Sequence, residues 1–375
     1  MYDNEILDVL TFARINHFNL VEKAQLLRKA GCASVIIENR LNIKDVFPEC
    51  SERVSEGLKD IEDAKRRAES EIDYVLRNDI KILSLSSEDY PQRLGECEDA
   101  PVVLFYKGTA NLNAKRIVSI VGTRHCTVYG QDIIRRFVAD LRQLCPEVLI
   151  VSGLAYGVDI NAHQQALSNG YDTVAVLAHG LDTIYPSRHR DTANRMLSQG
   201  GLLTEYFTFT NADKLNFLRR NRIVAGLSDA TIVVESASHG GGLVTARLAL
   251  EYNREVFAFP GRIGDTYSEG CNNMIRDSKA AMITSATDFV NMMGWEDDAT
   301  LTKARKTGIE RTLFPDLTPE EQRVADILLK EGDMQINVIS SVIGLPIHQL
   351  TSLLFTMEMK GVVRVLAGGV YHIIS

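Results

Sequence analysis

The chain has 375 residues, and at roughly 150 residues per domain this length allows two or three domains. A composition of 45% hydrophobic and 24% charged residues excludes wholesale disorder. No apolar run reaches the ~18 residues of a membrane helix, and the N-terminus lacks the basic region of a secretory signal. We therefore expect a cytoplasmic protein with no membrane partner.

The net charge of −8 argues, taken alone, against a nucleic-acid partner. The charge is uneven, however: residues 1–75 carry −4, residues 312–375 carry −3, and residues 76–311 carry only −1. The basic residues of the middle part are clustered. The six cysteines contain no Cys-x-x-Cys pair, which excludes a zinc ribbon and argues against a disulfide scaffold.

The first 75 residues predict a small helical domain. No proline precedes Pro48, and apolar residues recur at helical spacing in residues 6–13 and 20–31. Residues 51–71 mix opposite charges four apart, as an exposed helix does.

Residues 76–296 predict an α/β domain. Short apolar runs typical of buried strands lie at 116–122, 148–153, 173–178, 231–236 and 255–261, and helical segments separate them. This alternation favours a doubly wound parallel sheet. Residues 297–316 have the composition of a linker. Residues 317–375 show three helices followed by two short strands, which is a winged-helix pattern.

Ligands of an open parallel sheet bind beyond the carboxyl ends of its strands. After the strand at 116–122 come Gly122, Thr123 and Arg124, where backbone N–H groups can face an anion and the arginine can hold a phosphate in two hydrogen bonds. The alternative is a surface arginine beside a tight turn. The segment lacks the dinucleotide pattern G-x-G-x-x-G, and no Gly-Lys-Ser or Gly-Lys-Thr occurs in the chain, so NAD binding is disfavoured and a P-loop is excluded.

The loop after the next strand contains Gly153, Tyr156 and Gly157, whose glycines allow close approach of a phosphate. Asp159 and His163 follow, one helical turn apart. They form either a general-base pair or a helix cap with a packed histidine beside it, and the sequence leaves both open.

A basic segment covers residues 213–222, with a local charge of +3. Phe217 lies among its cations, which are Lys214, Arg219, Arg220 and Arg222. Cations interleaved with an aromatic ring suit single-stranded nucleic acid, because phosphates pair with the cations and a base stacks on the ring. The alternative is a solvated helix start with Phe217 in the core.

Two further loops contain glycine at strand ends. Ser238, Gly240 and Gly241 form a second loop able to cradle an anion, and Gly261 with residues 268–272 forms another. All five loops would converge on one groove. No metal-ligand spacing and no G-x-S-x-G nucleophile motif is present, so we predict no metal, no cofactor and no catalytic residue.

The segments SIVGTR, SGLAYGVDINAH, KLNFLRRNRIVAGLSDATIVVE, GGGLVTARLALEYNREVFAFPG and SEGCNNMI resemble, in this order, the motifs of the DNA-processing protein A (DprA/Smf) family. The resemblance covers about residues 76–290. It implies an extended Rossmann-like domain preceded by a SAM- or helix-hairpin-helix-like domain and followed by a winged helix. It also implies a homodimer, formed through the Rossmann-like domain, that binds and protects incoming single-stranded DNA and loads the RecA recombinase during natural transformation.

The resemblance places DNA contacts at Arg124, Lys214 and Phe217. Together with the loop residues, the predicted single-stranded DNA-binding set is Gly122, Thr123, Arg124, Gly153, Tyr156, Gly157, Lys214, Phe217, Arg220, Asn221, Arg222, Ser238, Gly240 and Gly241. The chain departs from the family in two places. It has Gly240, Gly241 and Gly242 where Ser-Gly-Ser is usual, and Tyr156 where arginine is frequent.

Two other functions compete with this interpretation. A nucleotide phosphoribohydrolase on a similar core would show P-G-G-x-G-T-x-x-E, which residues 238–245 match only in part. A transcription regulator would use the winged helix, but its third helix contains only one basic residue, Lys360, where a recognition helix normally brings several. We therefore expect that domain to contact proteins or to regulate.

Overall fold

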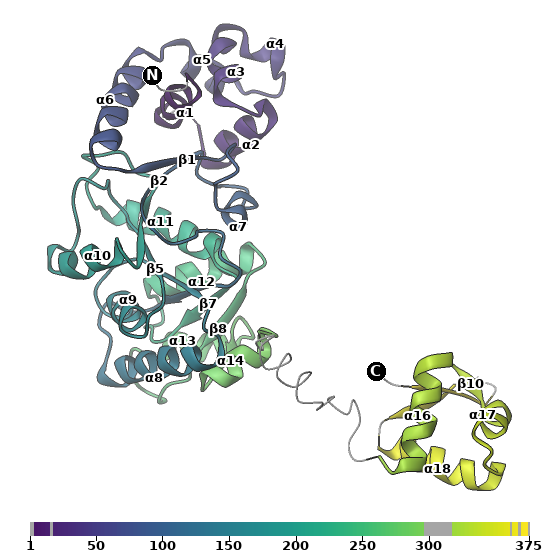
Figure 1. The fold of residues 1–375 in the computed structure, drawn as a ribbon. Helices are drawn as coiled ribbons and strands as arrows, with labels where there is room; N and C mark the ends of the chain where they lie inside the picture. The colour runs from purple at the N-terminus through teal and green to yellow at the C-terminus, as the bar shows by residue number, and fades with distance from the viewer. Residues whose placement is uncertain (1–3, 16–17, 296–316, 361, 367–368, 374–375) are drawn as a thin grey trace. The chain divides into compact units, whose positions relative to one another are not determined.

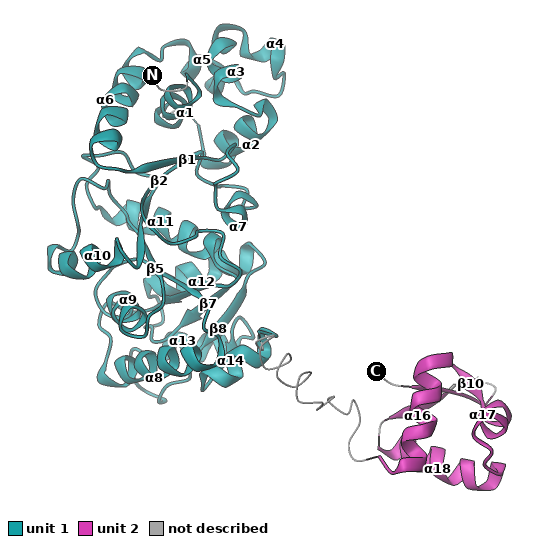
Figure 2. Cartoon of the chain, in the orientation of Figure 1, with its two compact units in different colours: residues 1–296 teal, residues 297–375 magenta. Residues whose placement is uncertain are grey.

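The computed structural model describes residues 4–15, 18–295, 317–360, 362–366 and 369–373. The chain divides into two compact units, residues 1–296 and 297–375 (Figure 2). The predicted linker at 297–316 and the centre of the C-terminal hairpin lie outside the described residues. The predicted boundary at residue 75 stays a prediction.

The first unit begins with helices, as the sequence predicts. They are α1 (Asn4–Arg14), α2 (Leu20–Ala30), α3 (Ala33–Glu38), the 3-10 turn η1 (Arg40–Asn42), α4 (Ile43–Val46), α5 (Glu52–Lys59) and α6 (Glu62–Arg77). Helix α2 begins at a capping box, in which the Asn19 side chain accepts from the Glu22 N–H and the Glu22 carboxylate accepts from the Asn19 N–H. Their shared core contains Phe12, Leu27 and Ile36, all fully buried.

A nine-stranded sheet follows in the described residues, in the order β1-β2-β6-β5-β4-β3-β7-β8-β9 (Figure 1). Its strands are β1 (Lys81–Ser84), β2 (Val103–Gly108), β3 (Ile117–Val121), β4 (Leu149–Ser152), β5 (Thr173–Val176), β6 (Gly200–Thr204), β7 (Ala230–Val233), β8 (Glu255–Ala258) and β9 (Ala281–Met282). Strands β3 to β9 pair in parallel, and β1 and β2 add an antiparallel edge. The predicted α/β class with an extended, Rossmann-like parallel sheet is confirmed.

Helices cover both faces of this sheet. They are α7 (Gln92–Gly95), α8 (Val128–Leu144), α9 (Val158–Ser168), η2 (Ser187–His189), α10 (Arg190–Met196), α11 (Lys214–Leu227), α12 (Gly241–Glu251), α13 (Glu269–Arg276) and α14 (Ala286–Met292). Ile223 of α11 and Ala246 of α12 belong to one buried layer, and Phe137 of α8 and Phe289 of α14 belong to the other. Because both faces are covered, the strands are continuous apolar runs.

Helix α11 starts at Lys214, because the Asp213 side chain caps it by accepting from the Asn216 N–H at 2.8 Å. Between β5 and β6 the chain forms the short helix α10, which ends at Met196.

The chain changes direction at β3. It runs outward through β4, β5 and β6 and then returns to β7 on the other side of β3. The loops that follow β3 and β7 therefore flank the switch point of the sheet, where open α/β sheets bind their ligands.

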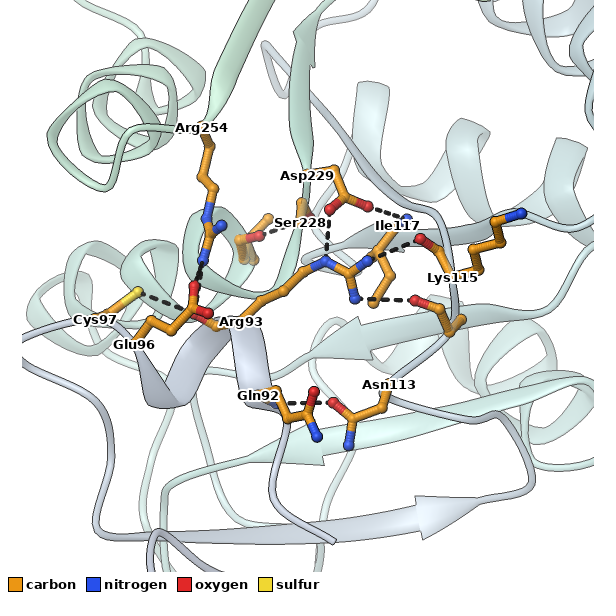
Figure 3. Close-up of polar contacts among 12 residues, drawn as sticks. Gln92, Arg93, Glu96, Cys97, Asn113, Lys115, Ile117, Ser228, Asp229 and Arg254 are labelled. Atoms are coloured by element: carbon orange, nitrogen blue, oxygen red, sulfur yellow. Dashed lines mark hydrogen bonds and ion pairs between the residues drawn. The ribbon is translucent and has the colours of Figure 1, made fainter. Parts of the chain in front are cut away.

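The amino ends of β3 and β7 are held by a polar cluster around Arg93 of α7 (Figure 3). Arg93 donates to the Asp229 carboxylate at 2.6 Å and to the carbonyls of Ala114 and Lys115, each at 2.9 Å. Asp229 also accepts from the Ile117 N–H at 2.8 Å. Arg93 and Asp229 thus tie α7 to the segments that lead into β3 and β7.

The second unit contains α16 (Pro319–Glu331), α17 (Ile336–Ile343), α18 (Ile347–Met359) and a sheet in the order β10 (Met334–Gln335), β12 (Val370–Ile373), β11 (Val363–Leu366). Its three helices and small sheet agree with the sequence, whereas the name winged helix stays a prediction. Glu321 is 2% exposed and accepts from Lys360 at 2.7 Å.

In the described part of the chain no single helix is long and apolar enough to cross a membrane. The pair α17 and α18 passes that test only when taken together across a bend of 109°, by length and composition alone.

Candidate functional site

The Phe217 ring lies beyond the carboxyl ends of the strands, partly exposed and close to two guanidinium groups. The Cζ atom of Arg124 is 4.8 Å from the ring centroid, and that of Arg220 is 5.8 Å from it. The ring of Tyr185, in the segment after β5, lies 6.0 Å away. The structure therefore brings together the loops after β3 and β5 and the first turns of α11. We call Arg124, Tyr185, Lys214, Phe217 and Arg220 the Phe217 platform.

Arg220 is buried at 4% exposure yet forms no hydrogen bond or ion pair with the described residues, and its buried Nε is without a partner there. Burial lowers the pKa of its guanidinium, the nearby Arg124 lowers it further, and Asp159 opposes the shift. A buried donor group without acceptors is costly. An anionic ligand would supply those acceptors through charge-assisted hydrogen bonds.

The glycine at position 153 makes room for this arginine. A Cβ atom at Gly153 would lie 1.6 Å from Nη1 of Arg220 and 2.2 Å from its Cζ. Any side chain there would displace the guanidinium, so Gly153 acts through Arg220.

Arg124 is carried by a rigid backbone. The Thr123 N–H donates to the Glu235 carbonyl at 2.7 Å, and the Val158 N–H donates to the Thr123 carbonyl at 3.1 Å. Gly157 has φ +77°, and a Cβ there would lie 2.2 Å from the Thr123 oxygen. Gly122 is packed similarly, since its Cβ would lie 2.6 Å from the Glu235 carbonyl oxygen. Gly122, Thr123 and Gly157 thus join the loops after β3 and β4 and position Arg124.

The amino end of α8 is occupied by the carboxylate of Glu235, which is 3% exposed. It accepts from the Thr127 N–H at 2.8 Å and from the Thr127 hydroxyl at 2.6 Å, and that hydroxyl caps the helix at Gly130. A dinucleotide-binding fold places a phosphate at this helix end. Here the protein's own carboxylate takes that place.

Tyr156 presents an exposed ring in the loop after β4. The ring is 42% exposed and meets the edge of His189 at 5.0 Å, and His189 Nδ1 lies 2.8 Å from the Leu154 carbonyl oxygen. Tyr156 is therefore held at the same edge of the sheet as Arg124, with much of its side chain exposed.

The remaining predicted residues lie on α11 and in the loop before α12. Lys214 is exposed on the first turn of α11 with no ion pair in the described residues, and Asn221 is partly exposed. Ser238, Gly240 and Gly241 form the loop before α12, which begins without a side-chain cap. Because a Cβ at Gly242 would lie 2.9 Å from Gly122 Cα, this loop borders the one that carries Arg124.

Arg222 faces away from the platform. It is 3% exposed, forms an ion pair with Glu205, and lies 3.8 Å from Asp99. Its guanidinium is already paired with a carboxylate inside the protein, so we leave Arg222 out of the interface proposed below.

Asp159 and His163 are buried parts of the scaffold. His163 is fully buried, its Nδ1 lies 2.7 Å from the Thr173 hydroxyl, and burial together with Arg220 lowers its pKa to about 3. Asp159 accepts from the Ala155 N–H at 3.3 Å, and no hydrogen bond joins the two residues. The described residues contain no group of three potential metal ligands.

Tyr185 and His189 were missed from the sequence. The rule that led to the other loops, glycine or a basic residue at the carboxyl end of a strand, selects Gly180 after β5 but not Tyr185, which lies five positions further on. A search for exposed aromatic residues beyond every strand end would have found Tyr185.

Comparison with known proteins places this geometry in a family. Residues 81–294 match the family described as DNA recombination-mediator protein A. The chain belongs to this family. It is 40% identical to the DNA processing protein DprA of Streptococcus pneumoniae over 55% of this chain and 72% of that protein. It is 34% identical to protein Smf of Escherichia coli over 81% of this chain and 80% of that protein.

Solved structures of the family agree. The crystal structure of DprA from Streptococcus pneumoniae superposes with a TM-score of 0.63 at 30% identity, covering 77% of this chain and 98% of that one. A structure of DNA processing protein A from Helicobacter pylori, reported for its single-stranded DNA binding mode, gives a TM-score of 0.52 at 30% identity over 57% of this chain and 95% of that one.

Proposed function

We propose that this protein binds single-stranded DNA on the Phe217 platform. The observation that carries the proposal is a partly exposed aromatic ring close to two arginines, one of them buried without a hydrogen-bond partner in the described residues. An unpaired base stacks on the ring, and the flanking phosphates accept from Arg124, Arg220 and Lys214. The Helicobacter pylori relative supports this, since its structure is reported with a single-stranded DNA binding mode.

Within that function, we propose that the protein acts without catalysis as a recombination mediator, protecting incoming single strands and loading RecA in transformation. Family membership supports the proposal. The platform itself consists of aromatic and basic side chains, while Asp159 and His163 are buried and bond to other partners.

We also propose a homodimer formed through the Rossmann-like domain. The parallel sheet ends at the short strand β9, and two apolar side chains there, Met282 and Met292, are 53% and 55% exposed. For the C-terminal unit we propose a protein-contact or regulatory role. The ion pair of Lys360 with the buried Glu321 supports it, because this base is held within the unit.

The decisive experiment is a titration of a fluorescent single strand of about 20 nucleotides, in a salt series, with the wild type and Arg124→Ala. Removal of one phosphate contact lowers the slope of log affinity against log salt by about 0.7. We expect weaker binding and this reduced slope. Arg135→Ala is the matched control, because Arg135 is 58% exposed on α8 and pairs only with Asp132 in the described residues. Equal affinity and slope for Arg124→Ala and wild type would refute the site.

RecA loading is tested separately, by the rate of RecA ATP hydrolysis on single strands coated with single-strand-binding protein. Addition of the wild type should shorten the lag, and Arg124→Ala should not. An unchanged lag with the wild type would leave the platform intact and refute the mediator role.

A further inference from the structure

A basic cavity lies in the first unit beside α11, apart from the Phe217 platform. It has a volume of about 280 Å³ and lies between the N-terminal helices and the sheet. Its charged lining residues are Arg14 at the end of α1, Lys23 of α2, Glu205 after β6 and Arg219 of α11. We call it the α1–α11 cleft.

The cleft carries an excess of positive charge. Its single carboxylate, Glu205, is already paired with the buried Arg222. Arg14 and Arg219 are exposed, and neither forms a hydrogen bond or ion pair with the described residues. Arg14 and Arg219 are therefore not needed to neutralise Glu205, which Arg222 already neutralises.

Lys23 adds a partly buried ammonium group to the cleft. It donates to the Ala13 carbonyl at 2.6 Å, and burial lowers its pKa to about 8, an effect that Glu205 opposes and Arg14 reinforces. A lowered pKa means that the charged form is poorly solvated. An anion in the cleft would stabilise it.

Helix α11 connects the cleft to the Phe217 platform. Lys214 and Phe217 belong to the platform, whereas Arg219 lines the cleft. Between them α11 exposes Leu215 and Leu218, which are 53% and 42% exposed. A strand that leaves the platform across α11 thus meets apolar side chains for its bases and then cations for its phosphates.

We propose that the α1–α11 cleft is a second phosphate-binding site for the same single strand, so that the N-terminal helices take part in DNA binding. This rests on the proposed function. It predicts that a strand long enough to cross α11 gains affinity from Arg14 and Arg219, and that a strand confined to the platform does not.

The test is a double variant, Arg14→Ser with Arg219→Ser, titrated with thymidine oligonucleotides of about 6 and about 25 nucleotides. At 0.1 M salt a phosphate contact contributes about fivefold relative to 1 M, so removal of two such contacts should weaken binding of the long oligonucleotide about 25-fold and reduce its salt slope by about 1.4. Binding of the short one should not change. Both arginines are exposed, so the thermal melting curve should match the wild type.

The matched control is Arg135→Ser with Arg136→Ser, which removes the same charge from exposed positions on α8. An equal reduction in this control would show a net-charge effect and overturn the inference. If the long oligonucleotide binds the Arg14 and Arg219 variant as tightly as the wild type while Phe217→Ala weakens it, the second site is refuted and the platform stands. If the wild type binds neither oligonucleotide, the proposed function itself fails.

Acylation of Lys23 gives an independent readout. At pH 8 a fraction of this amine is neutral and reactive, and mass spectrometry measures its modification. The long oligonucleotide should protect Lys23 and the short one should not. Equal modification with both would contradict occupancy of the cleft.

Discussion

Phe217→Ala separates base stacking from phosphate pairing. The ring is partly exposed, so its removal costs the folded protein mainly two cation–π contacts, to Arg124 and Arg220, worth about 0.5–1 kcal/mol each. Loss of one stacked base costs about 1–3 kcal/mol, which is about 5- to 150-fold in Kd. We expect affinity to fall within that range while the salt slope stays at the wild-type value, because no phosphate contact is removed.

The assay is fluorescence anisotropy with one oligonucleotide over a salt series, comparing Phe217→Ala, Phe217→Trp and Phe217→Leu. Tryptophan offers a larger stacking surface and should restore binding, whereas leucine fills space without an aromatic face and should not. If leucine binds as well as phenylalanine, the ring is only a packing element. A slope change in Phe217→Ala equal to that of Arg124→Ala would show that it acts through phosphate contacts, and the stacking argument would fail.

Three further predictions concern the scaffold. Gly153→Ala should weaken single-strand binding at least as much as Arg220→Ala, because the new Cβ would lie 1.6 Å from Nη1 of Arg220; wild-type affinity in a titration would contradict this. Glu71→Ala should lower the free energy of unfolding, measured in urea melts, by about 2–3 kcal/mol, because this 2% exposed carboxylate accepts from the Thr208 N–H and hydroxyl and pairs with Arg67 at 2.8 Å. The control is Asp63→Ala, at an exposed residue of the same helix, which should lower the free energy of unfolding by less than about 0.5 kcal/mol. The pKa of His163 is lowered to about 3, so this residue stays neutral in the folded protein while the unfolded chain takes up a proton below pH 6.5, and stability falls as pH falls from 6.5 towards 3. Between pH 7.5 and 5, this residue should lower the free energy of unfolding by about 2 kcal/mol. A His163→Gln variant with the same pH dependence of stability as the wild type would refute this argument.

The sheet could be predicted from the sequence because its strands are buried on both faces. The apolar run at 116–122 contains β3, and the run at 231–236 covers all of β7 except its first residue, Ala230. Both runs can be recognised from the sequence without knowing which strands pair with them. The site could be predicted only in part. Arg220 and Arg222 are identical in type and two residues apart, yet the helix turns about 200° between them, so one lies on the Phe217 ring and the other pairs with Glu205. Periodicity alone does not say which side faces the ligand.

Tyr185 illustrates a second limit. It lies 32 positions before Phe217, and only the packing of the segment after β5 brings the two rings within 6.0 Å. The α1–α11 cleft could not be predicted from the sequence either, since Arg14, Lys23 and Arg219 come from three helices whose arrangement depends on tertiary packing.

The carboxylate of Glu235 at the start of α8 affects how free nucleotides would compete with a DNA strand for the carboxyl edge of the sheet. A free nucleotide binds tightly only where one concentrated cradle holds its phosphate, and in this sheet that cradle carries a negative charge of its own. A strand can instead add several separate contacts, each weak alone. Millimolar ATP or NAD, far in excess of any single strand, should therefore leave bound DNA in place, and the protein can select a chain of nucleotides in a solution crowded with single ones.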